Sequence, residues 1–251
     1  MRGLKTKSTL VHSHPSEGAG SPQVSHINVG KTNIPIFIID NCYPAPDAML
    51  SQLSLSKFQP RKDDHYPGLR HQSPLAYIEF VTNSLPLYIS RYLQGQSTEY
   101  AAKWSSAKIS MSQFSMATFS ANALKPIQCI PHIDTHSEKE WALVHYLFST
   151  PLGGTAFYRH KETQLEQITS ASYEQYMNIL KRQATTVGLP PKAYIGEDSA
   201  LFEKIGQVDA AFNRAIVYPA NVLHSGLIPN HLTLPTCLKT GRLTANACLV
   251  C

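Results

Sequence analysis

The sequence lacks the features that mark several common classes of protein. Its five cysteines are odd in number and irregularly spaced, which argues against the paired cysteines of a zinc ribbon. No apolar stretch approaches the length of a membrane span, and the basic first residues lack the apolar core of a secretory signal. Lysine and arginine form no dense run. We therefore expect reduced cysteines and a cytoplasmic protein without a membrane or nucleic-acid partner.

The composition is that of a globular chain with a mild positive charge. Of the 251 residues, 43% are hydrophobic and only 16% are charged, and the net charge is +5. This length suits one sizeable core. Residues 1–30 are rich in Ser, His, Gly and Lys without sustained periodicity, so we predict a flexible N-terminal tail followed by one domain over residues 31–251. A local positive site would suit an anionic small molecule better than a polyanion.

The first half of the predicted domain contains one strand and two helices. The apolar run Ile34–Asp40 predicts a strand. Pro46 and Asp47 are typical of a helix start, and a second helix is expected after Ser84, where apolar residues recur at helical spacing until Gly95. These helices are expected to pack against the outside of a sheet.

From Lys108 onward the sequence changes to short strand-like runs separated by Pro and Gly. The predicted strands cover residues 108–119, 128–134, 141–148, 154–160, 214–219, 222–229 and 241–250. This succession predicts a mainly β fold with flanking helices, a jelly roll or double-stranded β-helix. A helical insertion near residues 172–206 is expected, with one helix around Tyr173 and Tyr176 and a second short helix marked by Leu201, Phe202 and Ile205.

Three side chains predict a metal site. His132 and Asp134 are two residues apart, so both project to the same side of an extended segment. His224 follows the predicted strand 214–219 and a Pro-Ala-Asn turn, where a later strand can bring it across the barrel. Two histidines and one carboxylate on one face suit non-haem Fe(II) and leave positions for a cosubstrate and dioxygen.

An arginine in the last predicted strand extends this pattern. Alternation places Arg242 and Thr244 on one face of that strand. A guanidinium can hold a carboxylate through two parallel hydrogen bonds, and the neighbouring hydroxyl adds a third polar group. The pair predicts a clamp for the far carboxylate of an acidic cosubstrate.

His136 is a rival for the third metal ligand. If the strand continues, His132, Asp134 and His136 share one face and all three can bind a metal locally. We favour His224, because a ligand from a distant strand fixes the ion more rigidly, with His136 near the metal or in the substrate pocket.

The arrangement of His132, Asp134, His224 and Arg242 resembles the Fe(II)- and 2-oxoglutarate-dependent dioxygenases. More narrowly, the chain is similar to a bacterial prolyl-hydroxylase-like group whose members mostly lack an assigned substrate. That similarity rests on DNCYPAPDAM, YPGLR at Tyr66–Arg70, LKPIQCIPHID at Leu124–Asp134 and GGTAFYRHKET at Gly153–Thr163. It extends from about Ile34 to the C-terminus.

The resemblance implies a cofactor, a cosubstrate and a reaction. By it, His132, Asp134 and His224 bind Fe(II), and Arg242 binds the C5 carboxylate of 2-oxoglutarate. The implied activity is oxidative decarboxylation of 2-oxoglutarate to succinate and carbon dioxide. This is usually coupled to hydroxylation, here of an amino acid, a peptide or a related small metabolite.

Several other polar residues are candidates for the substrate pocket. Gln128 and His136 flank the metal motif, and Arg159 and His160 follow a Gly-Gly turn where a strand returns toward the barrel mouth. Arg70 lies in the YPGLR segment, which we expect to form a lid or a substrate-facing loop. Two other histidines are expected to be structural: His145 as a packed and hydrogen-bonded side chain in an apolar strand, and His231 as an exposed loop residue.

Two other functions fit the same residues. One is a cupin-type metalloenzyme that does not use 2-oxoglutarate and so has no need of Arg242. The other is a non-catalytic jelly-roll module that binds a metal or ligand without turnover. The sequence does not indicate the oligomeric state.

Overall fold

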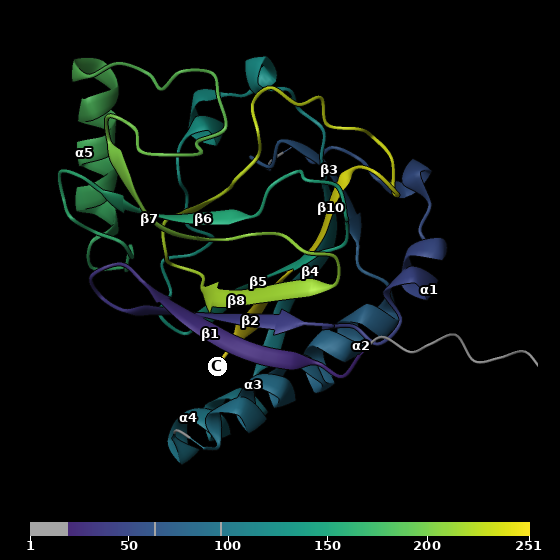
Figure 1. The fold of residues 1–251 in the computed structure, drawn as a ribbon. Helices are drawn as coiled ribbons and strands as arrows, with labels where there is room; N and C mark the ends of the chain where they lie inside the picture. Colours follow the sequence, from purple (N-terminus) through teal and green to yellow (C-terminus); the bar gives the residue numbers. More distant parts are fainter. Residues whose placement is uncertain (1–19, 63, 96) are drawn as a thin grey trace, which may run out of the picture.

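The computed structural model describes residues 20–62, 64–95 and 97–251. Its strands and helices follow one another along the chain as shown in Figure 1. The strands are β1 Gln23–Val29, β2 Ile34–Asp40, β3 Gly68–Gln72, β4 Lys108–Ala117, β5 Glu140–Tyr146, β6 Thr155–His160, β7 Phe202–Val208, β8 Arg214–Pro219, β9 His224–Gly226 and β10 Arg242–Val250. The α-helices are α1 Pro46–Ser51, α2 Leu75–Asn83, α3 Leu85–Leu93, α4 Thr98–Ser105 and α5 Tyr173–Thr186. Three short 3₁₀ helices cover Leu55–Lys57, Ala121–Ala123 and Pro126–Cys129.

The strands form two antiparallel sheets. The larger sheet has seven strands in the order β1-β2-β8-β5-β10-β4-β3, and the smaller has three in the order β7-β6-β9. In Figure 1 the strands β6 and β7 of the smaller sheet lie above β8, β2 and β1 of the larger one, while α2, α3 and α4 lie at the bottom and α5 stands beside β7. This mainly β architecture with flanking helices is a double-stranded β-helix, as predicted.

Side-chain alternation explains why the larger sheet is covered on both faces. On β10, Leu243, Ala245, Ala247 and Leu249 pack with the residues of α2, α3 and α4 in one apolar core. The intervening residues Arg242, Thr244 and Asn246 point to the opposite face and line a pocket. The period of two thus places the apolar residues under the helices and the polar residues inside the jelly roll.

The remaining core lies on both sides of the smaller sheet. Ile36, Tyr146, Ile216 and Phe157 belong to a cluster that joins the two sheets. On the other side, Tyr158 and Phe202 pack with Tyr176 of α5. The helical face predicted around Tyr173 and Tyr176 therefore serves to cover the smaller sheet. Among the described residues, no helix is both long and apolar enough to cross a bilayer.

The predicted boundary of the N-terminal tail was wrong. Residues 1–19 of that tail lie outside the described residues, but Gln23–Val29 form strand β1, which pairs with β2 from Gln23 opposite Asp40 to Val29 opposite Ile34. The connecting turn uses positive φ angles at Gly30 (70°) and Asn33 (53°). Such residues favour a tight hairpin. The polar composition of this edge strand concealed it, because only one of its faces packs on the protein.

The second helix of the predicted insertion was also wrong. Phe202 begins strand β7, which pairs with β6 across a register shift between Phe157 and Tyr158. Phe202 packs toward α5 and Ile205 toward the larger sheet. Their spacing of three resembles a helical face, but the two side chains lie on opposite sides of a strand. The predicted strand 128–134 is replaced by the 3₁₀ helix Pro126–Cys129 and a single bridge at His132.

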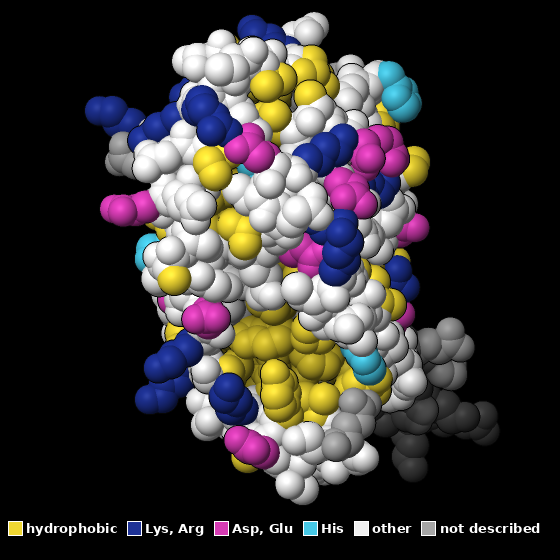
Figure 2. All heavy atoms as spheres, turned by 90° about the vertical axis from the view of Figure 1, so that its left-hand side faces the viewer, with side chains coloured by type: hydrophobic (Ala, Val, Ile, Leu, Met, Phe, Trp, Pro, Cys, Tyr) yellow, Lys and Arg dark blue, Asp and Glu magenta, His cyan; other side chains and the backbone are white. Residues whose placement is uncertain are grey.

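The face that carries α5 and β7 is turned toward the viewer in Figure 2. Positive and negative side chains are interspersed on its upper part. A hollow lined by apolar side chains opens lower down, at the level of β1, α3 and α4 in Figure 1.

Candidate metal centre and cosubstrate pocket

Backbone hydrogen bonds bring the three predicted metal ligands together. His132 and His224 form an isolated antiparallel bridge, in which each amide donates to the carbonyl of the other at 2.9 Å. The amide of Asp134 donates to the carbonyl of Ala220, also at 2.9 Å. The segment of His132 and Asp134 is therefore fixed by the main chain to the turn and strand that carry His224.

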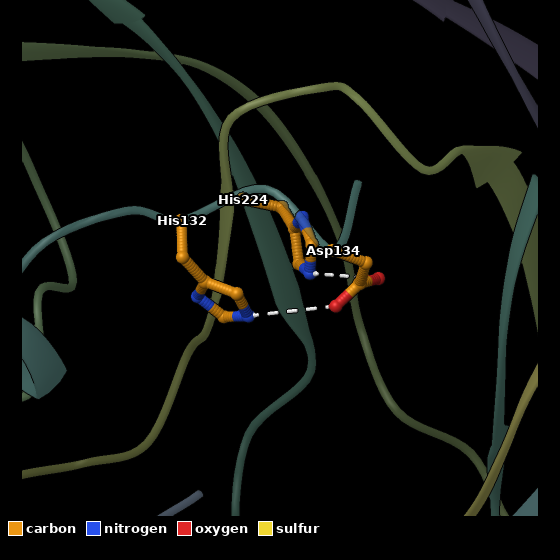
Figure 3. Close-up of side chains that lie close together, drawn as sticks. All are labelled: His132, Asp134 and His224. Carbon is orange, nitrogen blue, oxygen red and sulfur yellow. Dashed lines mark ion pairs between the residues drawn. The ribbon is translucent and has the colours of Figure 1, made fainter. Parts of the chain in front are cut away.

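The three side chains converge on one point (Figure 3). His132 Nε2 lies 3.9 Å from Asp134 Oδ1, and His224 Nε2 lies 3.7 Å from Asp134 Oδ2. All three donor atoms fall within 4.8 Å of one another. Because metal–nitrogen and metal–oxygen bonds are about 2.0–2.2 Å long, one ion between the donors can reach all three with small side-chain rotations.

The protonation of the two histidines suits a metal ligand. His224 Nδ1 lies 3.0 Å from the carbonyl oxygen of Val222, so Nδ1 carries the proton and Nε2 presents its lone pair. The surrounding protein and the neighbouring His224 lower the pKa of His132 to about 4, against the opposite effect of Asp134. Yet 52% of the His132 side chain remains accessible from the pocket. A neutral imidazole that a ligand can reach is the form that binds a metal.

His136 does not join this group. The described residues that could share one ion are His132, Asp134 and His224. His136 is exposed, and its ring lies 5.3 Å from that of Tyr173 at the start of α5. The chain turns after Asp134 instead of continuing as a strand. The structure therefore favours the distant histidine over the local one.

The three donors open into a pocket of about 860 Å³ between the two sheets. Arg242 and Thr244 line the same pocket. Arg242 is only 5% exposed, and its guanidinium donates through Nε to the carbonyl of Leu152 (3.1 Å) and through Nη2 to that of Gly154 (2.8 Å). Among the described residues, Nη1 has no hydrogen-bond partner and no carboxylate lies within 4.0 Å of the guanidinium. Arg242 is thus a buried cation for which the described residues provide no counter-ion.

The Gly153-Gly154 pair explains how Arg242 is held. Gly153 has φ +79°, and a Cβ there would lie 1.5 Å from the carbonyl oxygen of Leu227. A Cβ on Gly154 would lie 2.0 Å from the carbonyl oxygen of Val208. Both positions require glycine. The close packing of this segment holds the carbonyl oxygens of Leu152 and Gly154 within hydrogen-bond distance of the Arg242 guanidinium.

Tyr66 adds a hydroxyl to the same part of the pocket. Its oxygen is buried without a hydrogen-bond partner among the described residues. Burial raises the pKa of Tyr66, although the guanidinium of Arg242 acts in the opposite direction. The phenol therefore stays protonated and can donate a hydrogen bond near Arg242 and Thr244.

One family model matches the chain over most of its length. The model described as "Family of unknown function (DUF6445)" matches residues 20–249. The chain belongs to DUF6445. No curated protein matches this DUF6445 chain.

Solved structures resemble the DUF6445 chain only remotely. HygX from Streptomyces hygroscopicus, solved with nickel and 2-oxoglutarate bound, is 8% identical, with 86% of this chain and 82% of that chain covered and a TM-score of 0.44. AviO1 from Streptomyces viridochromogenes Tue57 is 12% identical, with coverage of 83% and 86% and a TM-score of 0.43. The epimerase SnoN in complex with Fe³⁺, alpha ketoglutarate and nogalamycin RO is 11% identical, with coverage of 86% and 78% and a TM-score of 0.44. At this distance they carry no argument about the chemistry of this chain.

Two of the predicted substrate residues of the DUF6445 chain line the pocket. Arg70 donates through Nε to Asp64 and through Nη1 to Ser115, and its guanidinium lies 4.2 Å from the centre of the Tyr66 ring. Gln128 donates to the carbonyl of His65 at 2.7 Å. The YPGLR segment therefore supplies both Tyr66 and Arg70 to the pocket.

Arg159 and His160 do not line this pocket, contrary to prediction. Arg159 is buried against two carboxylates, Glu166 at 2.6 Å and Glu203 at 2.7 Å. His160 lies between Thr163 and Gln183, 2.9 and 2.8 Å from its two ring nitrogens. Both strengthen the packing of β6 against its neighbours. The sequence did not reveal this because their partners come from distant segments.

The structural histidines of the DUF6445 chain behave as predicted. His145 is fully buried, with Nδ1 3.1 Å from the Tyr77 hydroxyl and Nε2 3.0 Å from the Asn213 side-chain oxygen. His231 is exposed in its loop.

Sequence reasoning missed Gln113 and Asn246, which also line the pocket. Asn246 follows Arg242 and Thr244 at the same alternation, so the pattern could have included it. Gln113 lies opposite Asn246 on β4, a register that only the paired sheet defines.

Proposed function

We propose that this protein is an Fe(II)- and 2-oxoglutarate-dependent dioxygenase. The observation that carries the proposal is the combination, in one pocket, of a two-histidine, one-carboxylate donor set with a buried arginine that has no counter-ion among the described residues. A facial set of this kind suits non-haem iron, and the arginine suits an anion. Neither half alone distinguishes an oxygenase from a simple metal site.

His132, Asp134 and His224 would hold the iron. Their donor set is one that Fe(II) accepts, and the other side of the site opens into the pocket. A bound Fe(II) would supply dioxygen activation coupled to the oxidative decarboxylation of 2-oxoglutarate. The Val222 carbonyl keeps His224 in the tautomer that binds metal, and the backbone bridge keeps both histidines in place.

Arg242 and Tyr66 would donate hydrogen bonds to the far carboxylate of 2-oxoglutarate, with Thr244 beside them. The free Nη1 of Arg242 and the phenol of Tyr66 are donors without partners among the described residues. A buried cation without a counter-ion is costly unless an anion joins it. A carboxylate ligand would therefore provide both the counter-ion and the hydrogen-bond acceptor that this guanidinium lacks among the described residues.

The finer parts of the proposal concern substrate and location. We propose hydroxylation of an amino acid, a peptide or a related small metabolite, with Arg70 and Gln128 on the substrate side of the pocket. We also propose a cytoplasmic protein. All five cysteines lie among the described residues and none forms a disulfide, which accords with a reducing compartment.

Anaerobic titration with Fe(II) and 2-oxoglutarate tests the proposal. We expect a metal-to-ligand charge-transfer band, and succinate once oxygen is admitted. Arg242→Met removes the charge that pairs with the carboxylate, so the affinity for 2-oxoglutarate should fall roughly a hundredfold. Arg91→Met, at an exposed position on α3, is the matched control.

Each rival function predicts a different result. A metalloenzyme independent of 2-oxoglutarate would bind iron, show no charge-transfer band, and be insensitive to Arg242→Met. A binding module would give the band without succinate. Absence of both band and succinate would refute the oxygenase.

A further inference from the structure

Gln113 is a buried polar side chain that the proposed iron and 2-oxoglutarate sites do not use. It lies within β4, is 6% exposed, and lines the pocket. Its side-chain oxygen is buried and finds no hydrogen-bond partner in the part of the chain that the structure describes. Its side-chain nitrogen makes no hydrogen bond with the described residues either. Because burial without a partner is unfavourable for a carboxamide, an external partner would explain this side chain.

The sheet places Gln113 beside the proposed 2-oxoglutarate clamp. Gln113 pairs with Asn246 of β10, and the next inward-facing pair along these strands is Ser115 with Thr244. Asn246 is already satisfied on its oxygen, which accepts from the Thr244 hydroxyl at 2.8 Å. Cross-strand neighbours lie about 5 Å apart, so Gln113 presents its carboxamide one step from the residues that face the cosubstrate. A molecule that fills the rest of the pocket would therefore contact the Gln113 carboxamide.

The charge of the pocket favours an anionic molecule. Its described lining includes four cationic side chains, Arg61, Lys62, Arg70 and Arg242, but only two carboxylates, Asp64 and Asp134. A divalent iron and a doubly negative 2-oxoglutarate cancel one another. The loaded pocket therefore keeps an excess of positive charge, and exposed Arg61 and Lys62 extend it to the rim.

We propose, on the basis of the function proposed above, that Gln113 determines specificity by hydrogen bonding to the amide of an anionic substrate. A carboxamide offers one acceptor and two donors in a plane, which complements the N–H and C=O of a secondary amide. The substrate class is then a secondary amide close to a carboxylate. An N-acylated amino acid and the C-terminal residue of a peptide share this chemistry.

Binding measurements with four small probes test the proposal. Calorimetry is performed on protein loaded with Mn(II) and 2-oxoglutarate, so no turnover is needed. The probes are N-acetylalanine, O-acetyllactate, which replaces the N–H by an oxygen, N-acetylalaninamide, which lacks the carboxylate, and N-acetyl-dialanine, a peptide terminus. N-acetylalanine should bind about tenfold more tightly than either O-acetyllactate or N-acetylalaninamide.

Gln113→Leu should abolish the preference for N-acetylalanine over O-acetyllactate. The matched control is Gln72→Leu, because Gln72 pairs with Gln113 on the neighbouring strand β3 but does not line this pocket. Gln72→Leu should retain the tenfold preference. Tighter binding of N-acetyl-dialanine than of N-acetylalanine would identify a peptide as the source of the amide, and the reverse a free acylated amino acid.

Thermal unfolding separates recognition from a structural role. Leucine removes a buried carboxamide without a partner, so Gln113→Leu should unfold at the same or a higher temperature than the wild type. A fall in melting temperature, with the preference for the amide unchanged, would overturn the inference.

Binding of 2-oxoglutarate to the Mn(II) protein must be measured before these experiments. If 2-oxoglutarate fails to bind the Mn(II) protein, the proposed function and this inference both fall. If it binds but Gln113→Leu leaves the ratio of N-acetylalanine to O-acetyllactate unchanged, only the inference falls.

Discussion

Arg242 and Arg159 are equally buried, each 5% exposed, yet they have opposite surroundings. Arg159 meets two carboxylates, Glu166 and Glu203, at 2.6 and 2.7 Å. Arg242 meets two backbone carbonyls and the ring of Phe148, whose centre lies 5.6 Å from the guanidinium, and no described carboxylate neutralises it. The charge of Arg159 is therefore neutralised within the protein, whereas that of Arg242 is left for the anionic ligand proposed above.

The histidines divide in the same way. Both ring nitrogens of His145 and of His160 have protein partners. His224 uses one nitrogen for Val222 and directs the other at Asp134, and His132 stays half accessible. Among these arginines and histidines, the side chains satisfied by the protein belong to the scaffold, and those with a free donor or acceptor line the pocket. This comparison makes predictions both for the scaffold residues and for the residues of the pocket.

The largest effect on the scaffold side is expected from Glu166→Ala. Glu166 accepts from Arg159 and also from the Lys31 and Thr32 amides of the β1–β2 turn. Breaking a buried pair on one side costs about 3–5 kcal/mol. Urea unfolding should show this loss, while 2-oxoglutarate binding to the folded protein stays unchanged. A loss below about 1 kcal/mol would contradict the scaffold role.

Acid sensitivity should also come from the scaffold. Burial lowers the pKa of His145 to about 4, although the Asn213 hydrogen bond acts the other way. The unfolded chain binds this proton near pH 6.5, so between pH 6.5 and 4 it binds more protons than the native state. Stability should then fall as pH falls, by roughly 3 kcal/mol. Unfolding across this range should lose that part of the slope in His145→Gln, but not in the loop variant His231→Gln.

On the site side, Asp134→Ala should weaken metal binding roughly a hundredfold, because even residues that merely support a metal ligand contribute about 10–100-fold. His136→Ala is the matched control and should retain full affinity for Mn(II) in calorimetry. Metal loss in His136→Ala with retention in His224→Ala would reverse the ligand assignment.

The smallest effect is expected from Tyr66→Phe. Removing one neutral donor from a carboxylate costs about 1–1.5 kcal/mol, or roughly a tenfold loss of 2-oxoglutarate affinity. The melting temperature should not fall, because the Tyr66 hydroxyl has no described partner. A destabilised variant with unchanged affinity would assign Tyr66 to the scaffold instead.

Local pattern predicted the strands that alternation or continuous apolarity defines. The runs Ile34–Asp40 and Arg214–Pro219 are strands β2 and β8 with the predicted bounds. Strand β1 was missed because its hydrogen bonds, more than its side chains, hold it to the sheet. Helices α2, which begins at Leu75, and α4, which begins at Thr98, were not predicted either. Their role is evident only from the core that they cover in the folded protein.

The site divides along the same line. His132, Asp134, His224 and Arg242 could be named from their types and spacing, and the structure brings them into one pocket. Arg159 looked equivalent to Arg242 in the sequence. The difference between them is a carboxylate from Glu203 on the paired strand β7, together with Glu166. Whether a polar residue is satisfied depends on such tertiary partners, which spacing along the chain does not specify.

The two backbone hydrogen bonds between His132 and His224 bring together the ends of the long segment that separates these residues. Folding, and not metal binding, therefore closes this loop. Those two amide–carbonyl bonds form when the sheets assemble, so folding bears the loop-closure entropy that an ion would otherwise have to overcome. In many small metal sites the ligands come together only when the ion binds, and a chelator then unfolds the protein. Here a chelator should leave the fold intact, and metal exchange should be a local event at the mouth of a preformed site.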